Sequence, residues 1–310
     1  MTIGVTIPAS DTYQAANLIE EFVNQTGQAA AAGLSSVWFP QLLDYDAVMV
    51  AALAGRAFPG ISVGTGVVPI YPRHPLLISA LAQTAQAATG GRFTLGLGLG
   101  SKPFLKPAFG QPYPPPVQHL REYLAVLRPL LSGVETEFDG DILSLHPSMP
   151  TIVPGAKPVP IVVAAMGPKA LATAGELADG TLPYFAGPKA LSTNIVPVIG
   201  RAAASAGRPR PRVIAVFPAV VTREVEATRE VLGERLAAYE EIPSYRRILD
   251  AEGVAHAVDL AVVGDEELVA AAVQRYFDAG ATEVVISQAG VRSGEDRLRT
   301  WRLLGELNKR

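Results

Sequence analysis

The sequence predicts one α/β domain in which eight parallel strands close into a (β/α)8, or TIM, barrel. Short runs of apolar and β-branched residues alternate with longer segments of helical periodicity, and eight such pairs follow one another. Each strand segment is a nearly continuous apolar run, which is typical of parallel strands buried on both faces. The 310 residues suit a single barrel of this type. A doubly wound open sheet is the structural alternative, but it does not require eight units.

The expected elements alternate from the N-terminus onward. Residues Ile19 and Phe22 lie on one face of the first helix, Pro75 suits the first turn of the third, and Val269, Val273 and Tyr276 form the apolar face near the C-terminus. The expected strands are 3–7, 35–39, 61–68, 92–99, 161–165, 181–185, 213–221 and 282–287. The expected helices are 11–32, 46–56, 75–89, 117–131, 168–178, 188–206, 224–239, 266–279 and 295–307.

Three stretches depart from this alternation and are expected to be irregular insertions after the fourth and seventh strands. They cover about 101–118, 134–160 and 241–258. The second is rich in proline, and its Asp139-Gly140 pair predicts a hairpin turn. The whole chain, 1–310, is therefore interpreted as one barrel domain with these insertions.

Composition excludes several classes of function. The net charge of −3 gives no electrostatic basis for binding nucleic acid, and the absence of cysteine excludes disulfides, thiolate nucleophiles and cysteine-ligated metals. No apolar run reaches the length of a membrane span, and the N-terminus does not resemble a signal peptide. No cluster of His, Asp and Glu has metal-ligand spacing. We therefore expect a cytoplasmic protein that acts on a small molecule without a metal.

The residues most informative about function follow the strands, because active sites of such barrels lie at the C-terminal strand ends. The most distinctive stretches are Gly64-Thr65-Gly66-Val67-Val68-Pro69, Tyr71-Pro72-Arg73-His74-Pro75, the glycine-rich strand 90–100, and Val162-Val163-Ala164-Ala165-Met166-Gly167-Pro168-Lys169. In the last stretch small residues lead from a strand into a helix, whose free N–H groups and dipole favour an anion. The alternative is a tight turn that binds no ligand.

These stretches resemble the luciferase-like monooxygenase superfamily, in particular its oxidoreductases that depend on the deazaflavin coenzyme F420. The resemblance implies a flavin-like ring at the barrel mouth, resting on a bulge of the third strand with a non-prolyl cis peptide at Gly66-Val67. It also implies that the cofactor phosphate lies on the turn 165–169. The cofactor-binding residues expected on this basis are Gln41, Thr65, Gly66, Val67, Gly100, Ser101, Ala164, Ala165, Met166, Gly167, Pro168, Lys169 and Tyr184.

The alternating glycines Gly96, Gly98 and Gly100 face one side of the fourth strand. Their missing side chains either leave room for a bulky cofactor or let neighbouring strands pack closely. In the context of the resemblance, we favour room for the cofactor.

Coenzyme F420 and FMN are the two candidate cofactors. Coenzyme F420 carries a phosphodiester and an oligoglutamate tail, and three lysines are expected beside the mouth, namely Lys102, Lys106 and Lys169. The alternative is that these lysines only solvate loops. The stretch 164–168 also resembles the deazaflavin-dependent members, so we favour the deazaflavin, with FMN as the alternative.

The acid–base residues of many deazaflavin-dependent members are absent. Their Asp-His pair after the second strand corresponds to Gln41 and Leu42, and a glutamate after the fourth strand corresponds to Ser101. Gln41 and His74 are therefore only weak candidates for catalysis, and a capping role for His74 is the simpler interpretation. His119 is a further candidate near the cavity, whereas His146 and His256 are expected at the surface.

The sequence thus favours an oxidoreductase that transfers hydride between a deazaflavin and a small organic substrate. An FMN-dependent monooxygenase is the second enzymatic hypothesis, and a flavin- or deazaflavin-binding protein without turnover is the third. An unrelated barrel aldolase is disfavoured, because no lysine falls at a strand end inside the barrel. The apolar surface of the second and third helices is a candidate homodimer interface.

Overall fold

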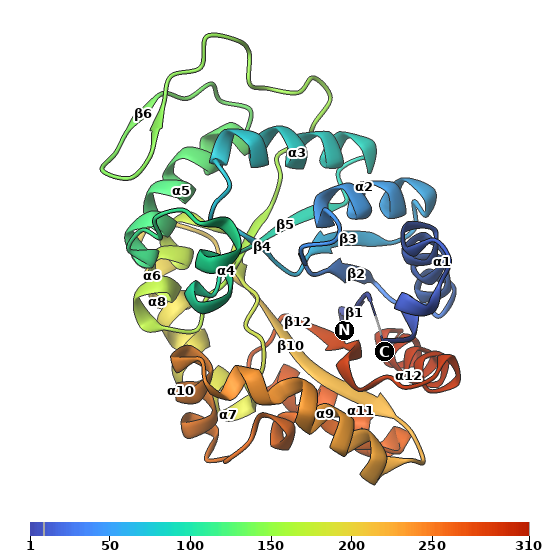
Figure 1. Cartoon of the computed structure of the whole chain (residues 1–310). Helices are drawn as coiled ribbons and strands as arrows, with labels where there is room; N and C mark the ends of the chain where they lie inside the picture. The colour runs from blue at the N-terminus through green and yellow to red at the C-terminus, as the bar shows by residue number, and fades with distance from the viewer. Residues whose placement is uncertain (9, 310) are drawn as a thin grey trace.

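A closed parallel barrel surrounded by helices forms the body of the molecule (Figure 1), in a computed structural model that describes residues 1–8 and 10–309. The strands pair in the order β1, β2, β3, β5, β8, β9, β10 and β12, and β12 pairs with β1 to close the ring. This confirms the expected (β/α)8 fold. Their bounds are Ile3–Thr6, Ser36–Phe39, Ser62–Thr65, Phe93–Gly98, Ile161–Ala164, Gly180–Thr181, Arg212–Val221 and Glu283–Ser287.

The surrounding helices begin at capping residues that the sequence already contains. Asp46 accepts hydrogen bonds from the Val48 and Met49 amides, and Asp265 accepts one from the Leu268 amide. The helices are α1 (Leu18–Ala31), α2 (Ala47–Ala57), α3 (Pro75–Ala88), α5 (Pro116–Leu131), α6 (Pro168–Leu177), α8 (Val196–Ser205), α9 (Val225–Glu240), α11 (Glu266–Asp278) and α12 (Gly294–Asn308).

Two helices differ from the prediction for local reasons. The first begins at Leu18 rather than residue 11, because Asn17 caps it and a separate 3-10 turn, η1 (Ser10–Gln14), precedes it. The expected helix 188–206 is divided into α7 (Pro188–Ala190), the π-helical turn η2 (Leu191–Ile195) and α8. Pro197 has no N–H to donate to the Thr193 carbonyl, which accounts for the widened turn just before it.

The insertions are more regular than expected. The Asp139-Gly140 hairpin is confirmed as β6 (Phe138–Asp139) and β7 (Ser144–Leu145), and its loop extends away from the barrel beyond α3 and α5 (Figure 1). However, 101–118 contains α4 (Lys102–Phe109), and 241–258 contains α10 (Pro243–Glu252) and η3 (Ala257–Leu260). The description of these two segments as irregular was wrong. A proline in the first turn and the left-handed Gly253 after the last turn are the signals that define α10.

Trp38 fills the middle of the barrel and determines which neighbours must be small. Its indole N–H donates to the Ser36 hydroxyl at 3.0 Å, and its ring packs with a cluster of inward residues on the other strands. A Cβ on Gly64 would lie 2.6 Å from the Trp38 ring. The other buried members of this inner cluster are Val162, Leu182, Ile214, Val216 and Val285, with Val67 and Tyr184 packed against it.

A bulge in the third barrel strand occupies the space left by the glycines of the fourth. Strands β3 and β4 (Val68–Pro69) both pair with β5, and the Gly66-Val67 peptide between them is cis, as the resemblance implied. A Cβ on Gly96 would overlap the Thr65 carbonyl, and one on Gly98 would lie 2.7 Å from a Val67 methyl group. Close packing, rather than direct room for a cofactor, therefore explains Gly96 and Gly98.

Substitution of Gly96 should destabilise the protein, because the added methyl group has no space beside the bulge. We expect Gly96→Ala to lower the free energy of unfolding by about 1–3 kcal/mol. Gly60→Ala is the matched control, since a Cβ there meets nothing within 4 Å, and its effect should stay within about 0.5 kcal/mol. Urea denaturation of both variants measures the difference, and equal stabilities would contradict this packing.

Candidate active site

The candidate site lies at the C-terminal mouth of the barrel, above the inner cluster around Trp38. Val67 and Tyr184 pack on top of that cluster. Thr6 and Ser287 each lie two residues beyond Gly4 and Val285, which pair in register, so they face the same side as those residues, the barrel interior. Val67 and Tyr184 come from opposite sides of the ring, and the mouth lies between them.

The inward residues divide this mouth into an apolar half and a hydroxyl-bearing half. Val67, Gly98 and Ala164, from neighbouring strands, present no hydrogen-bonding side chain. Thr6, Tyr184 and Ser287 supply hydroxyls on the other half, where the Tyr184 and Ser287 oxygens lie 3.2 Å apart. This apolar half suits the face of an aromatic ring.

The turn from β8 into α6 leaves a helix N-terminus without a side-chain cap at the mouth. Gly167 is the N-cap of α6, and no side chain caps the helix there, so the backbone N–H groups of its first turn remain available. The Thr181 hydroxyl donates to the Ala165 carbonyl at 3.1 Å, and this bond holds the backbone where the turn begins. Lys169 is exposed beside this turn.

Arg247 is a candidate anion-binding residue that sequence reasoning missed. It lies on α10, and its guanidinium Nη2 is 3.8 Å from the point where a Cβ of Gly167 would lie. The guanidinium thus faces the α6 N-terminus from the insertion 241–258. The helical pattern of that segment could have predicted a helix that carries Arg247. However, no spacing in the sequence links Arg247 to Gly167.

Ser101 follows β5 and carries an unsatisfied buried hydroxyl. Its backbone carbonyl accepts from the Leu105 amide at 2.8 Å, yet its Oγ is buried and has no hydrogen-bond partner among the described residues. Gly100, beside it, has a φ of +80°, a conformation that favours glycine. A Cβ there would also lie 2.4 Å from the Leu105 side chain. A polar atom left without a partner at the mouth fits a site that a ligand completes.

Gln41, Thr65 and His74 have structural partners for their polar side-chain atoms. The Gln41 amide donates to the carbonyls of Leu42 (2.6 Å) and Tyr45, and its oxygen accepts from the Ala47 amide. The Thr65 hydroxyl donates to the Gly96 carbonyl and accepts from the Gly96 amide, both at 2.8 Å. His74 caps α3 by accepting from the Leu76 amide. These bonds shape the mouth, and they support the capping interpretation of His74 over catalysis.

A family model described as luciferase-like monooxygenase matches residues 1–283. The chain belongs to the luciferase-like monooxygenase family. It is 26% identical over 306 residues to a 5,10-methylenetetrahydromethanopterin reductase of Methanopyrus kandleri, covering 85% of this chain and 86% of that protein.

Two solved structures of similar proteins share the fold over nearly their whole length. One is the coenzyme F420 dependent tetrahydromethanopterin reductase of Methanopyrus kandleri, with a TM-score of 0.80, 22% identity, and coverage of 98% of this chain and 97% of that one. The other is a type II Baeyer-Villiger monooxygenase of Pseudomonas putida in complex with FMN, with a TM-score of 0.75, 17% identity, and coverage of 99% and 97%. The chain is therefore an enzyme of a redox family, an oxidoreductase.

This luciferase-like enzyme has an aromatic cluster beside the hydroxyl half of its mouth. The Tyr184 ring lies 3.8 Å from that of Phe185 and 5.5 Å from that of Tyr239 on α9, and Tyr245 on α10 completes the cluster. Burial raises the pKa of the Tyr184 phenol well above its ordinary value, so it stays protonated at neutral pH. Phe185 has a φ of +62°, a strained conformation for an aromatic residue.

Tyr71 and Tyr113 hold the insertion 101–118 beside the apolar half. The Tyr71 hydroxyl donates to the Gln111 carbonyl at 2.7 Å, the Tyr113 hydroxyl lies 2.9 Å from the Gly100 carbonyl, and the two ring centroids are 4.8 Å apart. Lys102 and Lys106, on α4 within this insertion, are exposed.

Among residues 1–8 and 10–309, no group of three His, Asp or Glu side chains could hold a metal ion. In the same part of the chain, no helix is long and apolar enough to cross a membrane.

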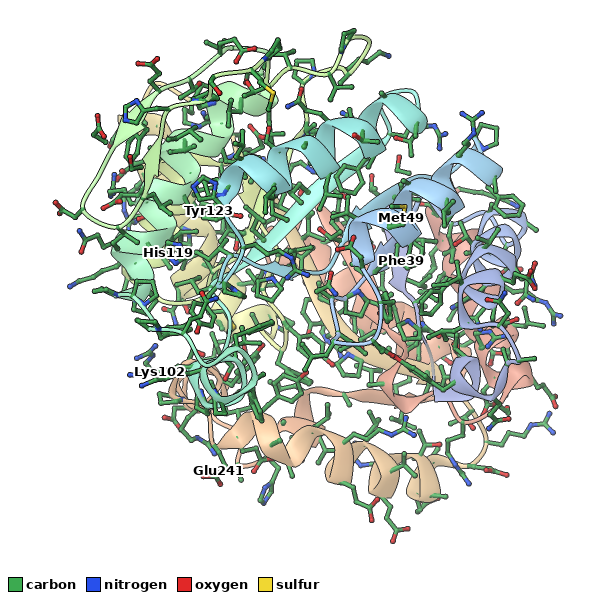
Figure 2. All side chains as sticks on the ribbon, turned by 45° about the horizontal axis from the view of Figure 1, so that its top comes forward. Phe39, Met49, Lys102, His119, Tyr123 and Glu241 are labelled. Carbon is green, nitrogen blue, oxygen red and sulfur yellow. The ribbon has the colours of Figure 1, made fainter. Side chains whose placement is uncertain are left out.

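His119 is buried on α5, one turn before Tyr123, with the two rings 5.7 Å apart (Figure 2). Desolvation lowers the His119 pKa below its ordinary value of 6.5, against a smaller opposing effect of Glu122. By contrast, His146 and His256 are exposed, as expected, and Asp139 raises the pKa of His146.

The opposite pKa shifts of His119 and His146 predict opposite dependences of stability on pH. Because the folded state disfavours charged His119, its contribution to stability is complete above pH 6.5 and is lost as the pH falls below that value. We expect His119→Asn to flatten the decline of the free energy of unfolding between pH 7.5 and about 5, measured by urea denaturation.

The control is His146→Asn. Its stabilising effect is present below pH 6.5 and is lost as the pH rises through the raised pKa, so removing it should not flatten the acid decline. An acid decline that is equal in wild type and His119→Asn would contradict the assignment.

Proposed function

We propose that this enzyme binds the deazaflavin coenzyme F420 at the barrel mouth and transfers hydride between it and a small organic substrate. When bound, a deazaflavin supplies or accepts a hydride. The observation that carries the proposal is the uncapped N-terminus of α6 with the Arg247 guanidinium opposite Gly167, next to an apolar half of the mouth that suits a ring. The similarity to a coenzyme F420 dependent reductase supports it.

The residues present fit such a cofactor. The phosphate would lie on the turn 165–169, within reach of the free amides, Arg247 and Lys169. The ring would rest on Val67, with the unsatisfied Ser101 hydroxyl at its edge. Ala164, Ala165, Met166 and Pro168 complete the turn, and Gly66 and Gly100 belong to the loops that flank the proposed ring position.

The preference for coenzyme F420 over FMN depends on charge around the mouth. Lys102, Lys106 and Lys169 come from adjacent barrel units, since β5 pairs with β8, and Arg247 adds a fourth positive charge. Such a group of cations suits an oligoglutamate tail, whereas FMN carries a single phosphate. An FMN-dependent monooxygenase is the alternative, and it has the same fold in a structure that contains FMN.

Titration of the purified protein with each oxidised cofactor, followed by cofactor fluorescence, tests this proposal. Micromolar or tighter binding of coenzyme F420 with weaker binding of FMN is the expected result. The reverse preference would assign the enzyme to the FMN alternative, and no binding of either would refute the redox cofactor site.

Arg247→Ala should weaken coenzyme F420 binding by roughly 10- to 100-fold, the loss of one charge-assisted hydrogen bond. Arg201→Ala, at an exposed arginine on α8 in the outer helix layer, is the matched control and should leave the Kd within about 2-fold. Equal Kd values for both variants would exclude Arg247 from the phosphate site.

We also propose a homodimer formed through the adjacent outer faces of α1, α2 and α3. Met49 (53% exposed), Leu53 (45%) and Leu77 (65%) leave a large apolar area on this side, and Ile19 and Val23 form a shallow groove beside Leu53. Figure 2 labels Met49 on α2. A second copy of the same surface would cover these residues by isologous contact.

Leu53→Glu should convert a dimer into a monomer in sedimentation velocity experiments. Leu268→Glu on α11 is the control, because Leu268 is 46% exposed but lies on another side of the barrel. A dimer that survives Leu53→Glu, or a wild-type monomer, would refute this interface.

A further inference from the structure

The enzyme lacks the usual acid–base residues at the ends of its second and fourth strands, so another group must supply a proton if the reaction needs one. Gln41 is held by the loop 42–47, and Ser101 cannot act as an acid near neutral pH. The hydroxyl half of the mouth contains a titratable group that the resemblance assigned to cofactor binding but that lies apart from the proposed positions of the phosphate and the ring. That group is the phenol of Tyr184.

The position of Tyr184 follows from the barrel register. Tyr184 pairs with Val216, and both contact the inner cluster, so the phenol ring points inward above the floor of the barrel. Its hydroxyl reaches across β10 to the Ser287 hydroxyl on β12, at 3.2 Å. The ring is fixed from the outside by Phe185 and Tyr239.

The contacts of Ser287 allow the Tyr184–Ser287 hydrogen bond to run in either direction. The Ser287 oxygen accepts from the Ala289 amide at 3.4 Å, and its own proton can be donated to the Tyr184 oxygen. In that arrangement the Tyr184 proton can be donated to a substrate in the mouth. The groups that face the phenol from neighbouring elements are Tyr239 of α9, Tyr245 of α10 and Ser287 of β12.

We propose that Tyr184, positioned by Ser287, donates a hydrogen bond and then a proton to the carbonyl oxygen of a ketone or aldehyde substrate. This inference rests on the proposed function, because the hydride donor is the reduced deazaflavin. The carbonyl carbon receives the hydride, the C=O π electrons move to oxygen, and that oxygen takes the Tyr184 proton to give the alcohol. The tyrosinate is reprotonated by water, directly or in one relay through the Ser287 hydroxyl, which receives a proton as it donates its own, and the hydroxide passes to the solvent.

The chemistry of the donor points to a carbonyl rather than to a cationic C=N acceptor. Reduction of a carbonyl generates an alkoxide, which requires a proton, whereas a cationic iminium accepts hydride without one. A neutral phenol also stabilises developing negative charge on oxygen by hydrogen bonding. Tyr184 and Ser287 offer neutral hydroxyls to the substrate, and neither carries a negative charge that would attract a cation.

The test uses the full-length enzyme with cyclohexanone and benzaldehyde as probes. The infrared C=O stretch of the bound probe, with and without oxidised coenzyme F420, should shift to lower frequency in wild type and in the control Tyr239→Phe. The shift should be absent in Tyr184→Phe and reduced in Ser287→Ala. With the reduced cofactor, Tyr184→Phe should lower kcat by about 10²- to 10⁴-fold while KM changes little.

Each outcome separates the inference from the proposed function. If Tyr184→Phe retains the shifted C=O band and the turnover rate, the inference is refuted. If coenzyme F420 binds tightly but neither probe binds or is reduced, the carbonyl assignment is refuted and the cofactor site stands. If the probes show the Tyr184-dependent shift but neither cofactor binds, the proposed function fails and the carbonyl site stands.

Discussion

The packing of the third barrel strand into the fourth is the constraint on which the mouth depends. Gly96 and Gly98 have no side chains, so the backbone of Thr65 to Val67 can approach β5 and fill that space. The Thr65 hydroxyl then forms hydrogen bonds with both the amide and the carbonyl of Gly96. Val67 packs against the inner cluster around Trp38. Larger residues on β5 would exclude the bulge, and the apolar half of the mouth would lose its shape.

Opposite that bulge, the structure places a different chemistry. The strands that lead to Tyr184, Ser287 and Thr6 contribute hydroxyls. Next to the apolar half, the insertion containing α10 brings Arg247 to the N-terminus of α6. One end of a single barrel therefore brings together an apolar surface, an uncapped helix N-terminus with an arginine near it, and side-chain hydroxyls. Most of these groups come from strand ends or from the insertions, which is why the same barrel supports other chemistries in the relatives.

The sequence was sufficient to predict the eight barrel strands, because buried parallel strands are continuous apolar runs bounded by glycine and helix caps. The cis Gly66-Val67 peptide in the bulge was expected from the family resemblance and is confirmed. The sequence was not sufficient to assign Gln41 and Thr65, whose polar atoms bond backbone groups that sequence patterns do not position. The capping role of His74 was the simpler interpretation of the sequence, and the structure supports it. Arg247 was missed for a related reason, because its partner turn is far away in the chain and α10 lies in a segment described as irregular.

A crystal structure with bound oxidised coenzyme F420 would test the central claim most directly. We expect a phosphate on the turn 165–169, with hydrogen bonds from the first amides of α6 and from Arg247, and a ring lying on Val67. A cofactor bound with its phosphate elsewhere, or with its ring on the hydroxyl half beside Tyr184 and Ser287, would contradict it.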